Sequence, residues 1–262
     1  MGVRVNFINP FGTPVYNKLI EETLRPYARP DTELVITNTK GCPENIDYYY
    51  NKHIVEMVVF EDVMRAEQEG FDAVIVGCCY DPGVRVAREL VDIPVIGPLE
   101  ATILMSPYYG HDYVVVTDHH KAVPYLRDMV RVYGGENCRD VSCIDWWVTD
   151  MIQDTEGVAK DALVKCRKAM EEARAEVVVL GCTIIAASME KWFLDTKAPR
   201  DLPILNTNTF SLKMAEALGE LKQRGLYNIN RGGYYQKPHQ RNSREFADVR
   251  ARFGRPSALV GR

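Results

Sequence analysis

Two cysteines, Cys78 and Cys182, occupy the same local setting in a chain of 262 residues. Each follows a glycine at the end of an apolar run, residues 73–76 and 177–180, and helix-like sequence comes next. A parallel strand that ends this way directs its thiol to the sheet edge where open α/β folds bind small ligands. N–H groups at the start of the next helix would favour the thiolate. Two such thiols could remove a proton from one face of a carbon and return one to the other, as a cofactor-free racemase does.

A purely structural role is the competing interpretation, because free cysteine is among the most buried residue types. The matching position of the pair favours a function for Cys78 and Cys182. Cys79 lies beside Cys78, and adjacent side chains diverge, so we expect it mainly in the core and keep it as a candidate substrate contact. The other four cysteines lack a comparable setting and are taken as structural: 42, 138, 143 and 166.

Four polar residues are further candidates for contact with a substrate. Asn9 follows the first expected strand, and Thr117 and His119 follow another. The hydroxyl of Thr183, with the N–H groups of the helix starts, could stabilise an oxyanion. Turn formation or helix capping is the alternative role for these residues. The histidines and cysteines match no standard metal-ligand spacing, so no metal site is predicted.

Apolar, β-rich runs alternate with helical patterns along the whole chain, which predicts mostly parallel sheets covered by helices. We expect strands at residues 1–8, 33–37, 71–77, 93–96, 113–117, 141–144, 177–181 and 203–205. Helices are expected at 13–27, 48–70, 81–91, 98–106, 120–133, 156–175, 186–193 and 209–224.

The two halves of the chain repeat one order of elements: helix, strand, Gly-Cys, helix, and a short strand with a proline. An accidental match is the alternative, since α/β proteins contain many such units. The repeat predicts an α/β fold of two related Rossmann-like lobes, each with a mostly parallel four-stranded sheet, and an active site in the cleft between them. Lobe 1 comprises residues 1–98 completed by 206–238, and lobe 2 comprises 99–205. Residues 239–262 form a C-terminal extension that wraps the surface, contacts a subunit or is partly disordered, with a possible helix at 243–253.

Composition narrows the possible partners. The net charge is −4 and no basic stripe is present, so nucleic acid is not an expected partner. No apolar run reaches the roughly 20 residues that span a bilayer.

Seven cysteines without an export signal indicate reduced thiols in the cytoplasm. No phosphate loop, pyridoxal lysine motif or dinucleotide fingerprint is visible, so no cofactor is expected. We expect a homo-oligomer, a dimer, tetramer or hexamer, that acts on a small molecule.

The motifs together resemble the hydantoin and allantoin racemases of the aspartate/glutamate racemase superfamily. The resemblance covers about residues 3–238 and is most specific at Cys78-x-x-Asp81-Pro82-Gly83. Other matching segments are Ile8-Asn9-Pro10, Ala87-Arg88-Glu89-Leu90, Ile93-Pro94-Val95-Ile96-Gly97, Glu100-Ala101, Leu180-Gly181-Cys182, Gly225-Leu226 and Arg231-Gly232-x-Tyr234. It implies two α/β lobes, no cofactor, and Cys78 and Cys182 as base and acid on opposite faces of the carbon of a 5-substituted hydantoin.

Three segments depart from that family's pattern: Pro10-Phe11-Gly12, Thr117-Asp118-His119-His120 and Asn206-Thr207-Asn208. The corresponding loops surround the ligand in the family, so the chemistry can be kept while the substrate differs. Cis–trans isomerisation or decarboxylation of a small carboxylate is the alternative within the superfamily. A non-catalytic small-molecule binding protein is the alternative from another class.

Overall fold

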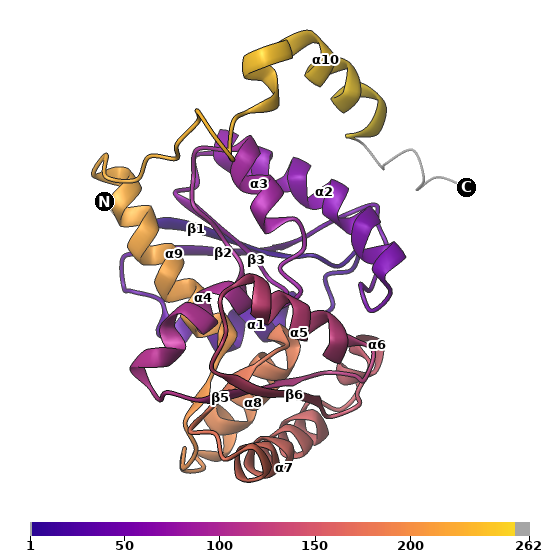
Figure 1. The fold of residues 1–262 in the computed structure, drawn as a ribbon, viewed down its shortest axis with the longest axis vertical. Coiled ribbons are helices and arrows are strands. Elements are labelled where there is room, and N and C mark those ends of the chain that lie inside the picture. The colour runs from indigo at the N-terminus through magenta and orange to yellow at the C-terminus, as the bar shows by residue number, and fades with distance from the viewer. Residues whose placement is uncertain (1, 255–262) are drawn as a thin grey trace.

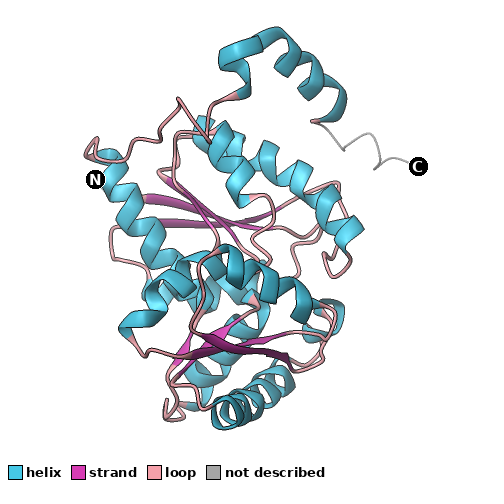
Figure 2. Ribbon diagram, in the orientation of Figure 1, coloured by secondary structure: helices cyan, strands magenta, loops and turns pink. Residues whose placement is uncertain are grey.

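The computed structural model describes residues 2–254, which form two four-stranded parallel sheets, each covered by helices (Figures 1 and 2). The strand order is β2-β1-β3-β4 in the first sheet and β6-β5-β7-β8 in the second. The same order in both confirms the predicted α/β fold of two related lobes. The predicted limits of the lobes in the sequence stay a prediction.

The first sheet consists of β1 (Arg4–Asn9), β2 (Glu33–Asn38), β3 (Ala73–Val76) and β4 (Val95–Ile96). Its chain segment also forms α1 (Asn17–Leu24), α2 (Tyr49–Gln68), α3 (Val84–Leu90), α4 (Pro98–Met105) and the short 3₁₀ turns Arg25–Tyr27 and Ser106–Tyr108. The second sheet consists of β5 (Tyr113–Thr117), β6 (Cys138–Cys143), β7 (Val177–Leu180) and β8 (Ile204–Leu205). The remaining helices are α5 (Ala122–Val132), α6 (Val148–Met151), α7 (Thr155–Ala173), α8 (Thr183–Thr196), α9 (Thr207–Gln223) and α10 (Pro238–Phe253).

The central strands are buried on both faces, as continuous apolar runs in a parallel sheet require. Every residue of β3, β5 and β7 is buried. Helix α9 comes from the end of the chain but packs on β1, β3 and β4 of the first sheet, and α1 packs against α8. The packing of α1 against α8 joins the two lobes. Within residues 2–254, no helix combines the length and the apolar character that a bilayer span requires.

The glycine before each candidate cysteine is explained by close packing at the end of the strand. A Cβ atom on Gly77 would lie 2.1 Å from Cε1 of Phe7, and one on Gly181 would lie 2.7 Å from Cγ1 of Val115. Only glycine leaves room for these neighbours. The repeated Gly-Cys pattern therefore reflects equivalent strand ends in the two sheets.

Several helices and strands begin at residues other than those predicted from the sequence. Helix α3 begins at Val84 and not at Asp81, because Gly83 has a left-handed backbone with φ of 69°. The buried carboxylate of Asp81 instead accepts the N–H groups of Leu99 and Glu100 at the start of α4, at 3.2 and 3.0 Å. The strand predicted at 141–144 begins at Cys138, since β6 is a half-exposed edge strand without an apolar run. Helix α6 was not predicted.

The C-terminal segment is attached to the first lobe by ion pairs of Arg231 and Lys237 with Asp92 and of Arg250 with Glu61. Arg231 donates to the carbonyl oxygen of Arg88 at 2.9 Å and pairs with Asp92 at 2.7 Å. Helix α10 then lies beyond α2 and α3, at the end of lobe 1 remote from lobe 2 (Figure 1). It is longer than the predicted helix at 243–253 and contains a kink at Asn242. Residues 255–262 of the predicted extension lie outside the described residues.

Candidate active site

The C-terminal ends of β3 and β7 meet at the boundary between the lobes. The Thr183 hydroxyl donates a hydrogen bond of 3.0 Å to the carbonyl oxygen of Gly77. The Cys79 thiol lies 3.6 Å from the carbonyl oxygen of Leu180 in the opposite lobe. The two Gly-Cys strand ends are thus joined by direct contacts between one lobe and the other.

Cys182 is the N-cap residue of α8 and is 6% exposed. Burial raises the pKa of its thiol well above the usual value, and the Asp118 carboxylate raises it further. Hydrogen bonds from the N–H groups of Ile185 and Ile184 act in the opposite direction. The expected helix N-terminus beside this thiol is therefore present.

Cys78 has a different environment, although it is also buried, with 8% exposure. A turn follows it instead of a helix, so the expected helix start beside this thiol is wrong. The N–H of Tyr80 donates to Sγ at 3.4 Å, and the buried Lys52 supplies a nearby cation. Burial raises the pKa of the Cys78 thiol, and both Tyr80 and Lys52 oppose that increase. Cys182 thus lies at a helix end, whereas Cys78 lies at a turn, where Asp118 and Asp81 raise the thiol pKa further and Lys52 is paired with Glu56.

Cys79 and Asn9 are both buried close to this boundary. The Cys79 thiol also lies 3.5 Å from the hydroxyl of Thr207, so it occupies a polar position in the core. Asn9 is completely buried at the end of β1, and the β1–β3 register pairs its neighbour Ile8 with Val76. Its amide nitrogen donates to Asn17 at 2.7 Å, but its Oδ1 atom has no partner among residues 2–254. A buried carbonyl oxygen without a partner is available to a ligand N–H.

Thr117 and Asp118 connect the end of β5 to the second thiol. The Thr117 hydroxyl lies 2.9 Å from Asp118 Oδ1 and 3.0 Å from the carbonyl oxygen of Gly181, which precedes Cys182. Asp118 also accepts the N–H of His119 at 2.9 Å. Burial raises the pKa of the Asp118 carboxyl, and His119 opposes this shift.

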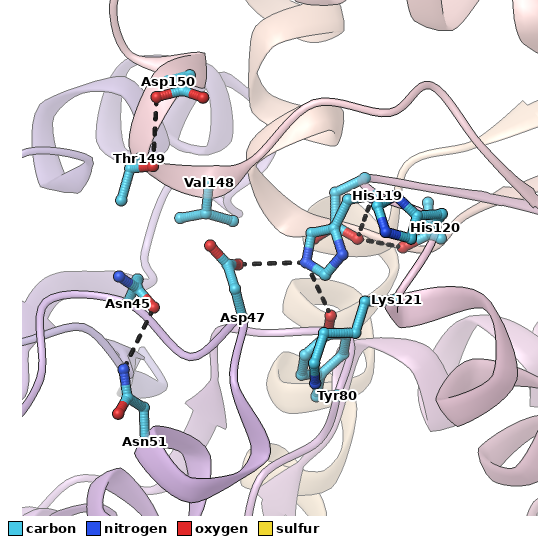
Figure 3. Close-up of polar contacts among 12 residues, drawn as sticks. Asn45, Asp47, Asn51, Tyr80, His119, His120, Lys121, Val148, Thr149 and Asp150 are labelled. Atoms are coloured by element: carbon cyan, nitrogen blue, oxygen red, sulfur yellow. Dashed lines mark hydrogen bonds and ion pairs between the residues drawn. The ribbon is translucent and has the colours of Figure 1, made fainter.

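His119 pairs with a carboxylate from the opposite lobe. Its Nε2 atom lies 3.4 Å from Oδ1 of Asp47 and 3.4 Å from the hydroxyl of Tyr80 (Figure 3). The imidazole ring stacks on Trp147 with 4.2 Å between ring centroids. Burial lowers the pKa of His119, but Asp47 and Asp118 together raise it above the usual value.

Aromatic contacts join the lobes next to this pair. The rings of Tyr48 and Trp147 stack with 5.9 Å between centroids, and the ammonium of Lys121 lies 3.4 Å from the ring centroid of Tyr49. The Tyr16 hydroxyl donates to the carbonyl oxygen of Val148. These contacts extend the boundary outward from the buried thiols.

Sequence reasoning missed Asp47 and Tyr80 as neighbours of the site, and it placed Asp118 near the ligand without giving it a role. The aromatic segments around Tyr48 and Trp147 were visible in the sequence, but nothing in it indicated that they stack. Asp47, Asp118 and His119 each offer a ligand atom within 4.8 Å of the others, and they are the one group of this kind within residues 2–254. Carboxylate and imidazole ligands would suit a divalent cation.

Several known proteins are similar to this chain in fold and in sequence. A family model described as Asp/Glu/Hydantoin racemase matches residues 5–215. The hydantoin racemase of Pseudomonas sp. (strain NS671) is 29% identical over 220 residues, covering 84% of this chain and 87% of that protein. The structure of allantoin racemase from Klebsiella pneumoniae has a TM-score of 0.81 at 24% identity, covering 90% of this chain and 94% of that one. Allantoin racemase from Pseudomonas fluorescens has a TM-score of 0.79 at 25% identity, covering 90% and 97%.

Proposed function

The chain belongs to the Asp/Glu/hydantoin racemase family, and we propose that it racemises a 5-substituted hydantoin, a class that includes allantoin. Relatives named hydantoin racemase and allantoin racemase, each similar over most of the chain, support this reaction type. The observation that carries the mechanism is the meeting of two equivalent Gly-Cys strand ends, with Thr183 bonded to Gly77 across the boundary. Each lobe then supplies one thiol, Cys78 or Cys182, to one face of the substrate.

The reaction needs only proton transfers. The thiolate of one cysteine removes the hydrogen of ring carbon C5, forming an S–H bond, and the electron pair of the C–H bond moves into the adjacent carbonyl to give an enolate. The thiol of the other cysteine donates its proton to the opposite face of C5 and becomes a thiolate. The substrate loses one proton from C5 and gains one on the opposite face, so the reaction balances without a cofactor.

Asn9 is the proposed contact for the ring of the substrate. Its buried Oδ1 atom has no partner within residues 2–254, while its amide nitrogen is held by Asn17. A ring N–H donating to this oxygen would remove a desolvation cost of about 1–3 kcal/mol. The contact would also orient C5 next to Gly77 and Cys78, since β1 lies beside β3.

The N-terminus of α8 is the proposed site for negative charge. The N–H groups of Ile184 and Ile185 face Cys182, and the helix dipole adds a positive potential there. These donors would stabilise a thiolate or the developing enolate oxygen. Thr117 and Thr183, both bonded to glycine carbonyls at the strand ends, would hold the two thiols in position.

Solvent exchange tests this proposal. Each enantiomer of a 5-substituted hydantoin is incubated with the protein in D₂O at neutral pD, against a protein-free control for spontaneous exchange. We expect optical rotation to decay to zero while C5 acquires deuterium, measured by NMR. Binding without exchange would indicate a binding protein, and exchange or isomerisation confined to small carboxylates would indicate another reaction; either result would contradict the proposal.

A further inference from the structure

We propose that Asp47, paired with His119, selects substrates whose substituent ends in adjacent N–H donors, a ureido or guanidino group, over substrates with a hydrocarbon substituent. This inference rests on the proposed function and names the substrate class of the same site. It concerns the substituent on C5, whereas Asn9 and the thiols act on the ring.

The carboxylate of Asp47 is buried but has spare acceptor capacity. The residue is 2% exposed, and within residues 2–254 its only ion-pair or hydrogen-bond partner is His119 (Figure 3). The 3.4 Å separation is longer than a well-formed N–H···O hydrogen bond. A carboxylate has about four lone-pair positions and can accept two parallel N–H groups. Ureido and guanidino groups present such a pair of donors.

The surroundings of Asp47 favour donors and cations over acceptors and anions. Asp118 is a second buried carboxylate, so one imidazole faces two acidic groups. The ring of His119 is fixed by stacking on Trp147, and its Nδ1 atom has no partner in the described part of the chain. Lys121 also lies close enough to lower the pKa of His119, so the donor preference rests on the free acceptor positions of Asp47. A hydrocarbon group in this position would leave the carboxylate of Asp47 desolvated, with His119 as its only compensation among residues 2–254.

The Asp47–His119 pair is connected to both thiols. Tyr80 contacts His119 through its hydroxyl and donates its N–H to Sγ of Cys78. On the other side, Asp118 follows Thr117, whose hydroxyl contacts the residue before Cys182. In the proposed arrangement, a substrate ring held between the thiols has its C5 substituent on the side of the boundary where Asp47 and His119 lie.

The test compares substituents on the wild-type protein and on two matched variants. Racemisation of allantoin, which carries a ureido group, and of 5-(3-guanidinopropyl)hydantoin is compared with that of the isobutyl and benzyl hydantoins. Asp47→Asn removes the charge of the proposed acceptor, and Glu44→Gln removes an exposed charge from the same loop. Asp47→Glu keeps a carboxylate at this position and is compared with Asp47→Asn. Thermal unfolding shows whether each variant is folded.

We expect Asp47→Asn to lower kcat/KM for the ureido and guanidino substrates by at least about tenfold, the usual effect of losing a charge-assisted hydrogen bond. The hydrocarbon substrates should change less than about threefold, Glu44→Gln should change neither class, and Asp47→Glu should restore part of the preference. An equal loss for both classes, or a wild-type preference for hydrocarbon substituents, would overturn the inference and leave the racemase proposal intact. A preference that disappears with EDTA and returns with Zn²⁺ would also overturn it, because these residues would then bind a cation. If no hydantoin is racemised, the proposed function itself fails.

Discussion

The hydroxyl of Thr183 and the carbonyl oxygen of Gly77 lie 3.0 Å apart, and both are buried. Thr183 is the first residue of α8 and follows Cys182, whereas Gly77 precedes Cys78. This hydrogen bond therefore connects the residue next to one thiol with the residue next to the other. Its removal tests how strongly racemisation depends on the relative position of the two cysteines.

Removal of this hydrogen bond should reduce both stability and activity. Thr183→Val keeps the shape of the side chain but leaves the Gly77 carbonyl without its partner, which costs about 1–3 kcal/mol in the free energy of unfolding. Urea unfolding measures this change. The rate of racemisation should also fall, because the two thiols are no longer held in a fixed position relative to each other. Thr183→Ser retains the hydroxyl and should preserve most of the activity. Equal activity in the valine and serine variants would show that the contact does not position the thiols.

Substitution by alanine should distinguish the two catalytic candidates, Cys78 and Cys182, from the adjacent Cys79. Cys78→Ala and Cys182→Ala should each abolish racemisation, because each removes the proton donor or acceptor on one face. Cys79→Ala should retain most of the activity, since that thiol is bonded to Leu180 and Thr207. The assay is the decay of optical rotation from each enantiomer, with near-ultraviolet circular dichroism to confirm folding. Racemisation at the wild-type rate by both Cys78→Ala and Cys182→Ala would exclude the two-thiol mechanism.

The two candidate thiols should be unreactive at neutral pH. Burial raises the pKa of Cys78 and Cys182 above the usual thiol value in the substrate-free protein, so at neutral pH only a small fraction is thiolate, and this fraction supplies the proposed base. Alkylation by iodoacetamide, followed for each peptide by mass spectrometry, should be slower than for glutathione at pH 7.5 and should continue to rise above pH 9. Rapid alkylation with a plateau below pH 8 would contradict this expectation.

A buried carboxyl on α2, that of Asp62, should control part of the pH dependence of the free energy of unfolding. Burial raises the pKa of Asp62 to about 6, and Arg65 only partly opposes this shift. A raised pKa favours the protonated folded protein, so this contribution to stability is present below pH 4 and is lost as the pH rises through 6.

Asp62→Asn should therefore be more stable than the wild type at pH 7.5, by on the order of 2 kcal/mol, and the gap should shrink toward pH 4.5. The lost pair with Arg65, which is 62% exposed, contributes little. Urea unfolding at both pH values measures the gap, with the exposed Asp31→Asn as a control. A variant that is equally destabilised at both pH values would show that the pair with Arg65 dominates.

The repeat could be predicted because β3 and β7, the strands before the two candidate cysteines, are unbroken apolar runs. The runs before Gly77 and Gly181 identify the strand ends, and the packing of Phe7 and Val115 explains why those glycines are required. Helix α3 was placed too early because sequence patterns do not reveal the left-handed backbone of Gly83. The edge strand β6 was partly missed because it is polar and half exposed.

The site was only partly predictable for a different reason. Cys78, Cys182 and Asn9 could be proposed because each follows a recognisable strand. Asp47 lies in an irregular loop, and its partner His119 belongs to the other lobe. No local periodicity relates the two, since their contact depends on how the lobes pack. The lysine beside Cys78 likewise comes from α2, which is distant in sequence from the strand.

The unequal surroundings of the two thiols have a kinetic consequence. Cys78 lies at a turn and Cys182 at the start of α8, so the two proton transfers need not have equal barriers. Enantiomers, however, have the same free energy in an achiral solvent. The Haldane relationship therefore requires a racemase to have the same kcat/KM for both enantiomers, whatever its asymmetry. The difference between the two lobes can appear only as matched changes in kcat and KM, with one enantiomer bound more tightly and converted more slowly.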